Sequence, residues 1–342
     1  MSRRQRTLSI EQMEARQMMA GDVAASVVGG TLYLNEASGQ AGLDNSVVVS
    51  QLSPGRIRVS SNSTSDGSSS LINGAAFQDF NVTGGLSVNF GAGNDLVVFD
   101  QLNPVKFTNV NINMGAPPPV VSQFAKVGVD TTLNPPDKDN VIMWGAEITG
   151  SLTVNTGDGN DWVYIANTPI GGNATINTGA GADTAQLKNL PGLIGGAVDI
   201  QLYSSLSEKD GDVAWLERVY ANGNINIRGG DGDDILHLDN VTAYQDFNLD
   251  AGAGNDRLEA NDVCAVDDLF ARLSDGNDSA DLRNLYVIHG RTQLDGGNGS
   301  DSLTKSGAFP TAQLTQTGFE WINGRLVFLG NASVNQAVMS RA

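Results

Sequence analysis

The sequence predicts an all-β protein: a right-handed parallel β-helix of about 22 residues per coil, with a short N-terminal helix and a C-terminal β cap. Three observations support this fold class. The composition is typical of turns and strands, with 41 glycines in 342 residues, 17% charged residues and 6% aromatic residues. A glycine turn that ends in an aspartate recurs along the chain. Apolar residues alternate on both sides of each turn, as in strands with one buried face.

The recurring aspartates define the repeat. The turns end at Asp95, Asp139, Asp161, Asp183, Asp212, Asp234, Asp256, Asp278 and Asp301. Most consecutive members of this series lie one constant step apart, which gives a repeat of about 22 residues. The two longer steps indicate insertions in the turns near 116–136 and 203–210. Upstream, Asn45 and Asp66 fit the same position more loosely.

Two strands per repeat follow from the apolar columns. Residues nine and seven before the aspartate are Leu152/Val154, Ala174/Ile176, Ile225/Ile227, Phe247/Leu249 and Leu269/Ala271, and residues two and four after it include Val163/Ile165, Leu236/Leu238 and Leu258/Ala260. A single repeat cannot bury its own apolar face, so the repeats are expected to stack about 4.8 Å apart. Six residues after the aspartate stands Asn167, Asn189, Asn240, Asp262 or Asn284, which predicts a second corner.

A leucine-rich repeat is the main alternative at this period, because the segment LHLDN is similar to the LxLxxN of that family. That architecture gives no reason for a glycine and acid turn in every copy. The turns therefore favour the β-helix.

The chain divides into an N-terminal sorting or cap segment (1–30), the repeats (31–307) and a C-terminal cap (308–342). Ser9 with Gln12 forms a capping-box pattern that predicts a short helix ending at Gly21. The segment from Arg6 to Ala20 resembles the RxLxxExLExRxLLA motif of exported planctomycete proteins, which implies export. In the C-terminal cap, Phe319, Trp321, Leu326 and Phe328 are expected to fill the end of the core and close the strand edges.

Two segments carry a more specific motif. GGDGDDILH (229–237) and GGNGSDSLT (296–304) both match GGxGxDxUx. They resemble the calcium-binding repeats of the RTX family. Shorter GxGxD matches precede Asp95, Asp161, Asp183 and Asp256, whereas Asp278 keeps only Gly276. Glycines with positive φ turn backbone carbonyls toward one point and the acid adds a charged oxygen, which together suit calcium.

The resemblance implies calcium bound between stacked turns. The residues predicted to bind it are Asp95, Asp161, Asp183, Asp234, Asp256, Asp278 and Asp301, with Gly157, Gly159, Gly230, Gly232, Gly252, Gly254, Gly297 and Gly299. RTX repeats recur at less than half this period, whereas one glycine turn per coil allows at most one column of ions. Asp139 and Asp212 follow the insertions and are expected to bind poorly. The alternative is an ion-free corner in which each aspartate accepts backbone N–H bonds.

Charge and composition limit the partners. The formal charge of −18 disfavours nucleic acid and anionic membrane surfaces and favours cations. No apolar run is long enough for a transmembrane helix. Cys264 is the single cysteine, so neither an intrachain disulfide nor a cysteine-based zinc site is possible.

An enzyme is the competing interpretation, because parallel β-helices also include polysaccharide lyases and glycoside hydrolases. Such sites combine acids with basic residues on one face. The aspartates here share one repeated corner, and His237 and His289 have no evident partner by register, so both histidines are interpreted as surface residues. The sequence therefore predicts a protein without catalytic residues.

The outward positions after the aspartates are apolar and aromatic in the earlier repeats and polar in the later ones. Trp162, Tyr164 and Trp215 are the predicted contact surface for glycans or surface proteins. The alternative is that the insertion near 116–136 covers part of this strip. Together these features predict an extracellular or cell-surface bacterial protein, a calcium-stabilised scaffold or adhesin.

Overall fold

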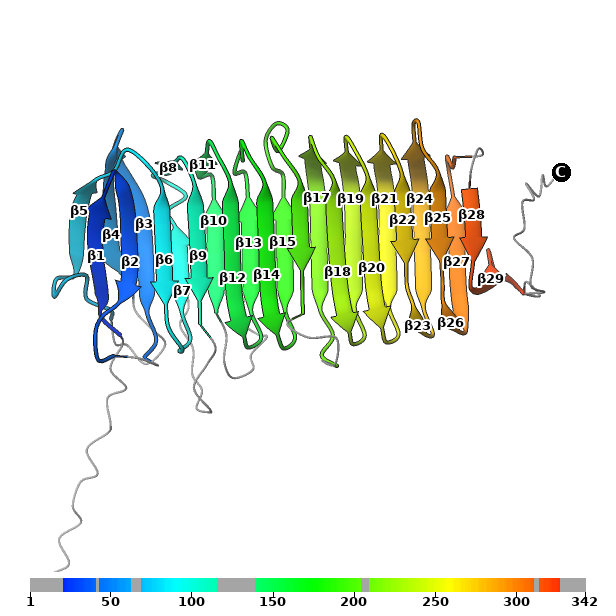
Figure 1. Ribbon diagram of the computed structural model, residues 1–342, viewed down its shortest axis with the longest axis horizontal. Coiled ribbons are helices and arrows are strands. Elements are labelled where there is room, and N and C mark those ends of the chain that lie inside the picture. The colour runs from blue at the N-terminus through cyan, green and yellow to red at the C-terminus, as the bar shows by residue number, and fades with distance from the viewer. Residues whose placement is uncertain are drawn as a thin grey trace, which may run out of the picture.

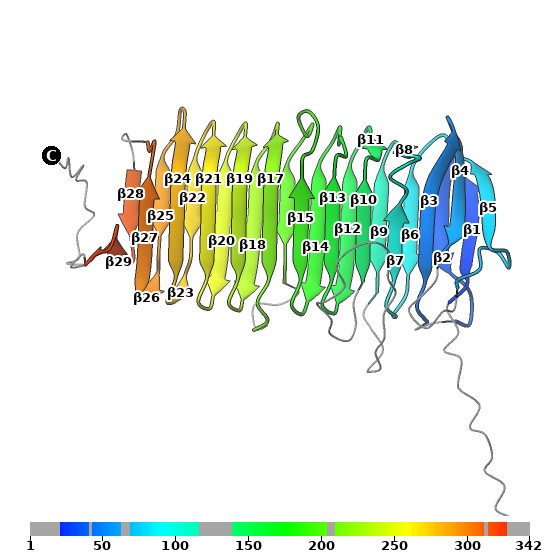
Figure 2. The ribbon, with the colours of Figure 1, turned by 180° about the vertical axis from the view of Figure 1, so that it is seen from behind.

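The computed structural model describes residues 21–40, 43–62, 69–115, 139–203, 209–310 and 314–326. These residues form a rod of about nine stacked coils, a parallel β-solenoid (Figures 1 and 2). Within these ranges all elements are strands and none is a helix long and apolar enough to span a bilayer. The predicted N-terminal helix and export motif, like the long insertion, lie outside the described residues.

One long side of the rod is a 14-stranded sheet in which β2 and all later neighbours pair in parallel. Its strands in spatial order are β1 (Val23–Val28), β2 (Thr31–Glu36), β6 (Leu86–Phe90), β9 (Val110–Met114), β12 (Leu152–Asp158), β14 (Ala174–Ala180), β16 (Val198–Gln201), β18 (Ile225–Asp231), β20 (Phe247–Ala253), β22 (Leu269–Arg272), β25 (Thr292–Asp295) and β28 (Leu314–Thr317), with β23 (Asp275–Gly276) and β26 (Asn298–Gly299) alongside.

The second 14-stranded sheet forms another long side of the rod. Its strands are β3 (Ser46–Ser53), β4 (Arg56–Ser61), β5 (Phe77–Asn81), β7 (Leu96–Phe99), β10 (Asn140–Trp144), β13 (Trp162–Ala166), β15 (Thr184–Lys188), β17 (Val213–Ala221), β19 (Ile235–Ala243), β21 (Arg257–Ala265), β24 (Ser279–Val287), β27 (Asp301–Ser306), β29 (Phe319–Ile322) and β30 (Arg325–Leu326). A short parallel pair of strands, β8 (Lys106–Phe107) and β11 (Glu147–Ile148), belongs to neither large sheet and lies on a third side of the rod.

The predicted period appears directly as strand register. Ile225 pairs with Phe247, and Leu236 pairs with Leu258 one coil further on. The predicted inward columns form the core: Val154 and Leu236, for example, are fully buried. The columns of both sheets pack against each other, which confirms the stacked β-helix.

The predicted second corner is also present. Asn167, Asn189, Asn240 and Asn284 have φ between 50° and 55°, and Asp262 has φ of 53°. Asparagine and aspartate tolerate this left-handed conformation better than other residues with a Cβ atom. The chain bends there and continues as a third side, with Val219 paired to Val241.

The ends of the rod depart from the repeat. β3, β4 and β5 form an antiparallel meander at the edge of the second sheet, so the residues after 31 are not all regular repeats. At the other end, β28 adds a final parallel strand and β29 pairs with β30 as a hairpin. Phe319 is buried as predicted, but Trp321 is 42% exposed, so the prediction that Trp321 fills the core is wrong. Phe319 pairs with Asp301 whereas Trp321 pairs with Ser302, and this register shift between β27 and β29 inserts one extra residue that turns Trp321 to the outward side.

Candidate functional site: the glycine and aspartate turns

The turns lie in one row at the edge where the first sheet passes into the second (Figure 1). All eight predicted site glycines have positive φ, from 99° at Gly297 to 149° at Gly299. Consecutive turns also stack closely: a Cβ atom on Gly252 would overlap the carbonyl oxygen of Gly230. Glycine is therefore required at this position by both conformation and space.

The aspartates that end the turns form a continuous hydrogen-bonded ladder. The Oδ1 atom of each accepts the backbone N–H of the ladder residue one coil earlier, at 2.7 to 2.9 Å. The ladder begins at the N–H of Asn45 and ends where Glu320 Oε2 accepts the N–H of Asp301 at 2.6 Å. Asn45 was predicted, but Glu320 was missed because it lies outside the repeat. Asp66 lies outside the described residues.

Every predicted site aspartate belongs to this ladder, and so do Asp139 and Asp212, which follow the insertions. Each of these residues is at most 4% exposed. The ion-free alternative predicted that each aspartate accepts backbone N–H bonds, and the structure shows this contact at Oδ1.

The second carboxylate oxygen has a different environment. Oδ2 of Asp95, Asp139, Asp234, Asp256, Asp278 and Asp301 is buried and has no hydrogen-bond partner among the described residues. A buried polar atom without a partner is unfavourable, and a charged one more so. The ladder thus gives one oxygen of each of these carboxylates a hydrogen-bond donor and leaves the other oxygen without one among the described residues.

Burial raises the pKa of these aspartates. It raises the pKa of Asp234 to about 7, of Asp256 to about 8 and of Asp278 to about 6, with neighbouring carboxylates adding to the effect. The pKa of Asp139 is well above its usual range, first through burial and then through the charges of Asp95 and Asp161. The corner therefore disfavours negative charge unless something compensates it.

The donor chemistry of the turn fits a calcium ion. At Gly229, a Cβ atom would overlap both Asp234 Oδ2 and the carbonyl oxygen of Ala251 in the next coil. A carboxylate oxygen and a carbonyl oxygen thus converge where the glycine leaves space, and both are oxygen ligands of the kind calcium takes. In the described ranges no three acidic, histidine or cysteine side chains cluster around one point. Carbonyl oxygens would therefore supply most of the ligands.

A second polar ladder lies beside the first, on the exposed side of the turn. Here the residue just before the aspartate accepts an N–H from the following coil: Asp233 Oδ1 from Asn255 at 2.7 Å, and Asn255 Oδ1 from Asn277 at 3.0 Å. The two ladders therefore run in opposite directions. The signal for this second ladder is present in the sequence, since Asn or Asp precedes several of the turn aspartates.

The predicted aromatic surface consists of two groups. Tyr164 contacts Trp162 and Trp144, with ring centroids 5.7 and 5.8 Å apart. Trp215 lies two strands away, across β15, and packs against His237 with ring centroids 4.4 Å apart. These side chains are half-buried between their neighbours. The predicted covering insertion lies outside the described residues.

The histidine at the surface has a partner that sequence reasoning missed. His237 and Glu259 are directly opposite in adjacent strands, and His237 Nδ1 lies 2.9 Å from Glu259 Oε2. This contact, with Arg257 beside it, lowers the pKa of Glu259. The expectation that His237 has no partner by register was wrong, because the 22-residue step places Glu259 at the same outward position in the next coil.

Comparison with models of protein families, with curated proteins and with solved structures finds no match for this chain.

Proposed function

We propose that the protein is a non-enzymatic β-helical scaffold of the adhesin type, exported or displayed at the bacterial cell surface and stabilised by calcium between its stacked turns. One observation carries the calcium proposal: a column of buried carboxylates, several of whose Oδ2 atoms lack hydrogen-bond partners among the described residues. Bound cations would supply the missing partners and offset the like charges.

The repetition of the ladder supports a structural role. All nine aspartates occupy one type of corner and make the same contact, whereas a catalytic pair needs two groups with different environments. Their burial also keeps them out of reach of a polymeric substrate. The aromatic side chains of Trp162, Tyr164 and Trp215, with Trp144 beside Tyr164, form the contact surface that we assign to a surface protein or glycan.

A calcium titration tests the proposal. Thermal unfolding is followed by circular dichroism in EDTA and then in calcium up to about 10 mM, which exceeds the dissociation constants of extracellular calcium modules. Each occupied site adds RT ln(1 + [L]/Kd), about 2.7 kcal/mol at a hundredfold excess over Kd. We expect a rise in Tm with calcium that EDTA reverses, and little rise with magnesium. An unchanged Tm contradicts calcium binding and leaves the fold intact.

A β-helix polysaccharide lyase or glycoside hydrolase is the alternative function. Incubation with acidic and neutral polysaccharides should release no new reducing or unsaturated ends. Turnover that a single substitution such as Glu259→Gln abolishes would instead establish an enzyme. Recovery of the protein only from the cytosolic fraction would contradict the proposed location.

A further inference from the structure

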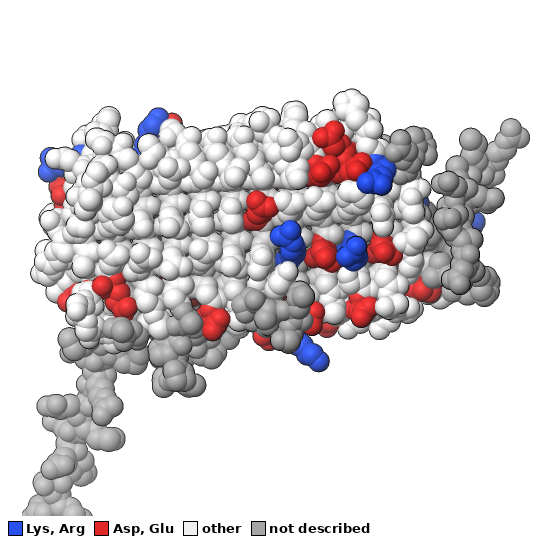
Figure 3. Space-filling model, in the orientation of Figure 1, with Lys and Arg blue, Asp and Glu red and all other residues white. Residues whose placement is uncertain are grey.

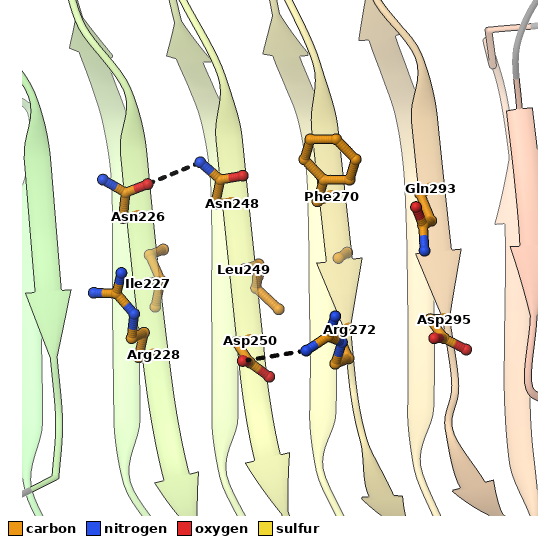
Figure 4. A pocket seen from close by; sticks show the side chains of 11 residues that line it. Asn226, Ile227, Arg228, Asn248, Leu249, Asp250, Phe270, Arg272, Gln293 and Asp295 are labelled. Atoms are coloured by element: carbon orange, nitrogen blue, oxygen red, sulfur yellow. Dashed lines mark hydrogen bonds and ion pairs between the residues drawn. The ribbon is translucent and has the colours of Figure 1, made fainter.

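A groove of about 410 Å³ crosses the outer face of the first sheet, over β18, β20, β22 and β25 (Figure 4). It runs along the rod between two rows of outward side chains. The first row is Asn226, Asn248, Phe270 and Gln293, which occupy equivalent positions in consecutive coils. This row therefore combines three amides with one aromatic ring.

The second row alternates in charge from coil to coil. Its members are Arg228, Asp250, Arg272 and Asp295. Figure 3 shows alternating blue and red side chains in a line along this part of the rod. Arg272 Nη1 lies 4.0 Å from Asp250 Oδ2, which is a loose ion pair. Two cations and two anions leave this groove without net charge, although the chain as a whole carries −18.

Several polar groups in the groove are available to a ligand. Asn248 Nδ2 donates to Asn226 Oδ1 at 2.9 Å, which leaves the carbonyl oxygen of Asn248 as an acceptor. Within the part of the chain that the structure describes, the side chains of Arg228 and Gln293 make no hydrogen bond or ion pair (Figure 4).

The aromatic ring of the groove is held in place by a neighbouring cation. The ring of Phe270 is half-buried and lies between Asn248 and Gln293 in the same row. The guanidinium carbon of Arg291 is 5.3 Å from the centroid of this ring. Arg291 is itself fixed by Asp268, whose Oδ2 lies 3.2 Å from Arg291 Nε. The position of the ring is therefore set before any ligand binds.

This combination is confined to one stretch of the sheet. In the same two columns, the preceding strands β6 to β14 carry only short polar side chains, namely Ser87, Asn89, Asn111, Asn113, Thr153, Asn155, Thr175 and Asn177. Short polar side chains of this kind are sufficient for an outer face that only contacts solvent. Arginine side chains begin only at β18, and Phe270 lies among them at β22, whereas the other aromatic residue of these columns in the described strands, Tyr33 of β2, lies beside Ser87.

We infer that this groove binds a linear, uncharged glycan lying along the rod. Sugar hydroxyls both donate and accept hydrogen bonds, so they match a wall of amides with alternating guanidinium and carboxylate groups. The apolar face of a sugar ring packs on an aromatic side chain such as Phe270. The open groove spans four coils and admits an elongated ligand rather than a compact one.

Other polymers fit less well. A peptide that adds to a β-sheet needs an unpaired strand edge, but β18, β20, β22 and β25 pair with neighbours on both sides. A polyanion such as nucleic acid or a polyuronate would meet Asp250 and Asp295 at every second position. The inference goes beyond the scaffold proposal and depends on neither calcium nor cellular location.

Isothermal titration calorimetry with the full-length protein tests the inference. The probes are linear oligosaccharides of glucose, xylose, mannose and N-acetylglucosamine, with oligogalacturonate as the charged comparison. We expect at least one neutral oligosaccharide to bind. Phe270→Ala should weaken it about tenfold, and Arg228→Ala or Asn248→Ala roughly fivefold through loss of a hydrogen bond.

Two control variants separate recognition from folding. Phe270→Tyr keeps the ring and should bind within about twofold of the parent protein. Asn111→Ala lies in the same column outside the groove and should leave affinity unchanged. The inference fails if no neutral oligosaccharide binds, if Phe270→Ala binds as tightly as Phe270→Tyr, or if oligogalacturonate binds as tightly as the neutral ligands.

Discussion

Replacing Asp256 by asparagine separates the two effects of the aspartate ladder on stability. Asp256 Oδ1 accepts the N–H of Asp234 at 2.9 Å, and its own N–H donates to Asp278 Oδ1 at 2.8 Å. Asparagine keeps a carbonyl oxygen that accepts the first bond and leaves the second in place. It removes the negative charge. The variant therefore tests the charge while the hydrogen-bonded ladder is retained.

The magnitude follows from the spacing of the coils. Carboxylates one coil apart, at about 4.8 Å, repel by about 0.9 kcal/mol in water and by more where water is excluded. Asp256 has two such neighbours, so at about pH 9, above its folded pKa of about 8, the variant removes at least about 2 kcal/mol of repulsion when no calcium is present. In EDTA we expect Asp256→Asn to raise Tm by about 4 °C. In saturating calcium the variant should gain less than the parent protein, because a charged ligand is lost.

Thermal unfolding in EDTA and in calcium measures both effects. Asp239→Asn is the matched control: it also removes one charge, but from the outward side of β19, where among the described residues Asp239 Oδ1 accepts only from Asn261 Nδ2, at 2.7 Å. Asp256→Ala removes the acceptor as well and should cost about 1–3 kcal/mol, since the N–H of Asp234 loses its partner. If Asp256→Asn destabilises the calcium-free protein as much as Asp256→Ala does, charge repulsion in the ladder is refuted. An equal calcium-induced shift in variant and parent refutes Asp256 as a ligand.

Two further predictions concern pH and the glycines. Because the folded pKa of Asp256 is about 8 against an ordinary value of 3.8, the folded state holds a proton that the unfolded state releases, so in EDTA the free energy of unfolding should fall as pH rises between these values. Urea midpoints that rise over this range would contradict it. Gly252→Ala should cost about 4 kcal/mol or more, because the added Cβ overlaps the carbonyl oxygen of Gly230. Gly192→Ala, at φ of 81° with open space around it, should cost only about 1 kcal/mol, and equal losses would contradict the stacking of the turns.

The repeat could be predicted from the sequence because, in a solenoid, residues one period apart in the chain lie next to each other in adjacent coils. A constant step between turns placed Ile225 opposite Phe247 and Leu236 opposite Leu258, and alternation along each strand decided which side chains are buried. The corners at Asn240 and Asp262 follow from a polar residue at the same position in successive repeats, and their φ values of 55° and 53° make them left-handed. These features depend on neighbours one period apart, which is information the sequence displays.

The remaining features depend on contacts that the period does not specify. The groove arises from differences between equivalent positions, such as Phe270 where Asn111 stands in an earlier coil, and a pattern search averages such differences away. Glu320 completes the ladder from a segment without the repeat. The pairing of His237 with Glu259 joins outward positions of adjacent coils, whereas the repeat is defined by the inward apolar positions.

The ladder also accounts for how the rod tolerates insertions. Consecutive ladder residues are separated by 50 residues between Asn45 and Asp95, 44 between Asp95 and Asp139 and 29 between Asp183 and Asp212, yet each pair makes the same bond at 2.7 Å. The extra residues all precede the second aspartate of the pair, so the bond restores the register just before the next strand begins. A shift by one residue would turn the apolar columns outward. The aspartate therefore fixes the register of each coil through its Oδ1 atom, whereas the proposed calcium would act on Oδ2, and the two roles can be separated by mutation.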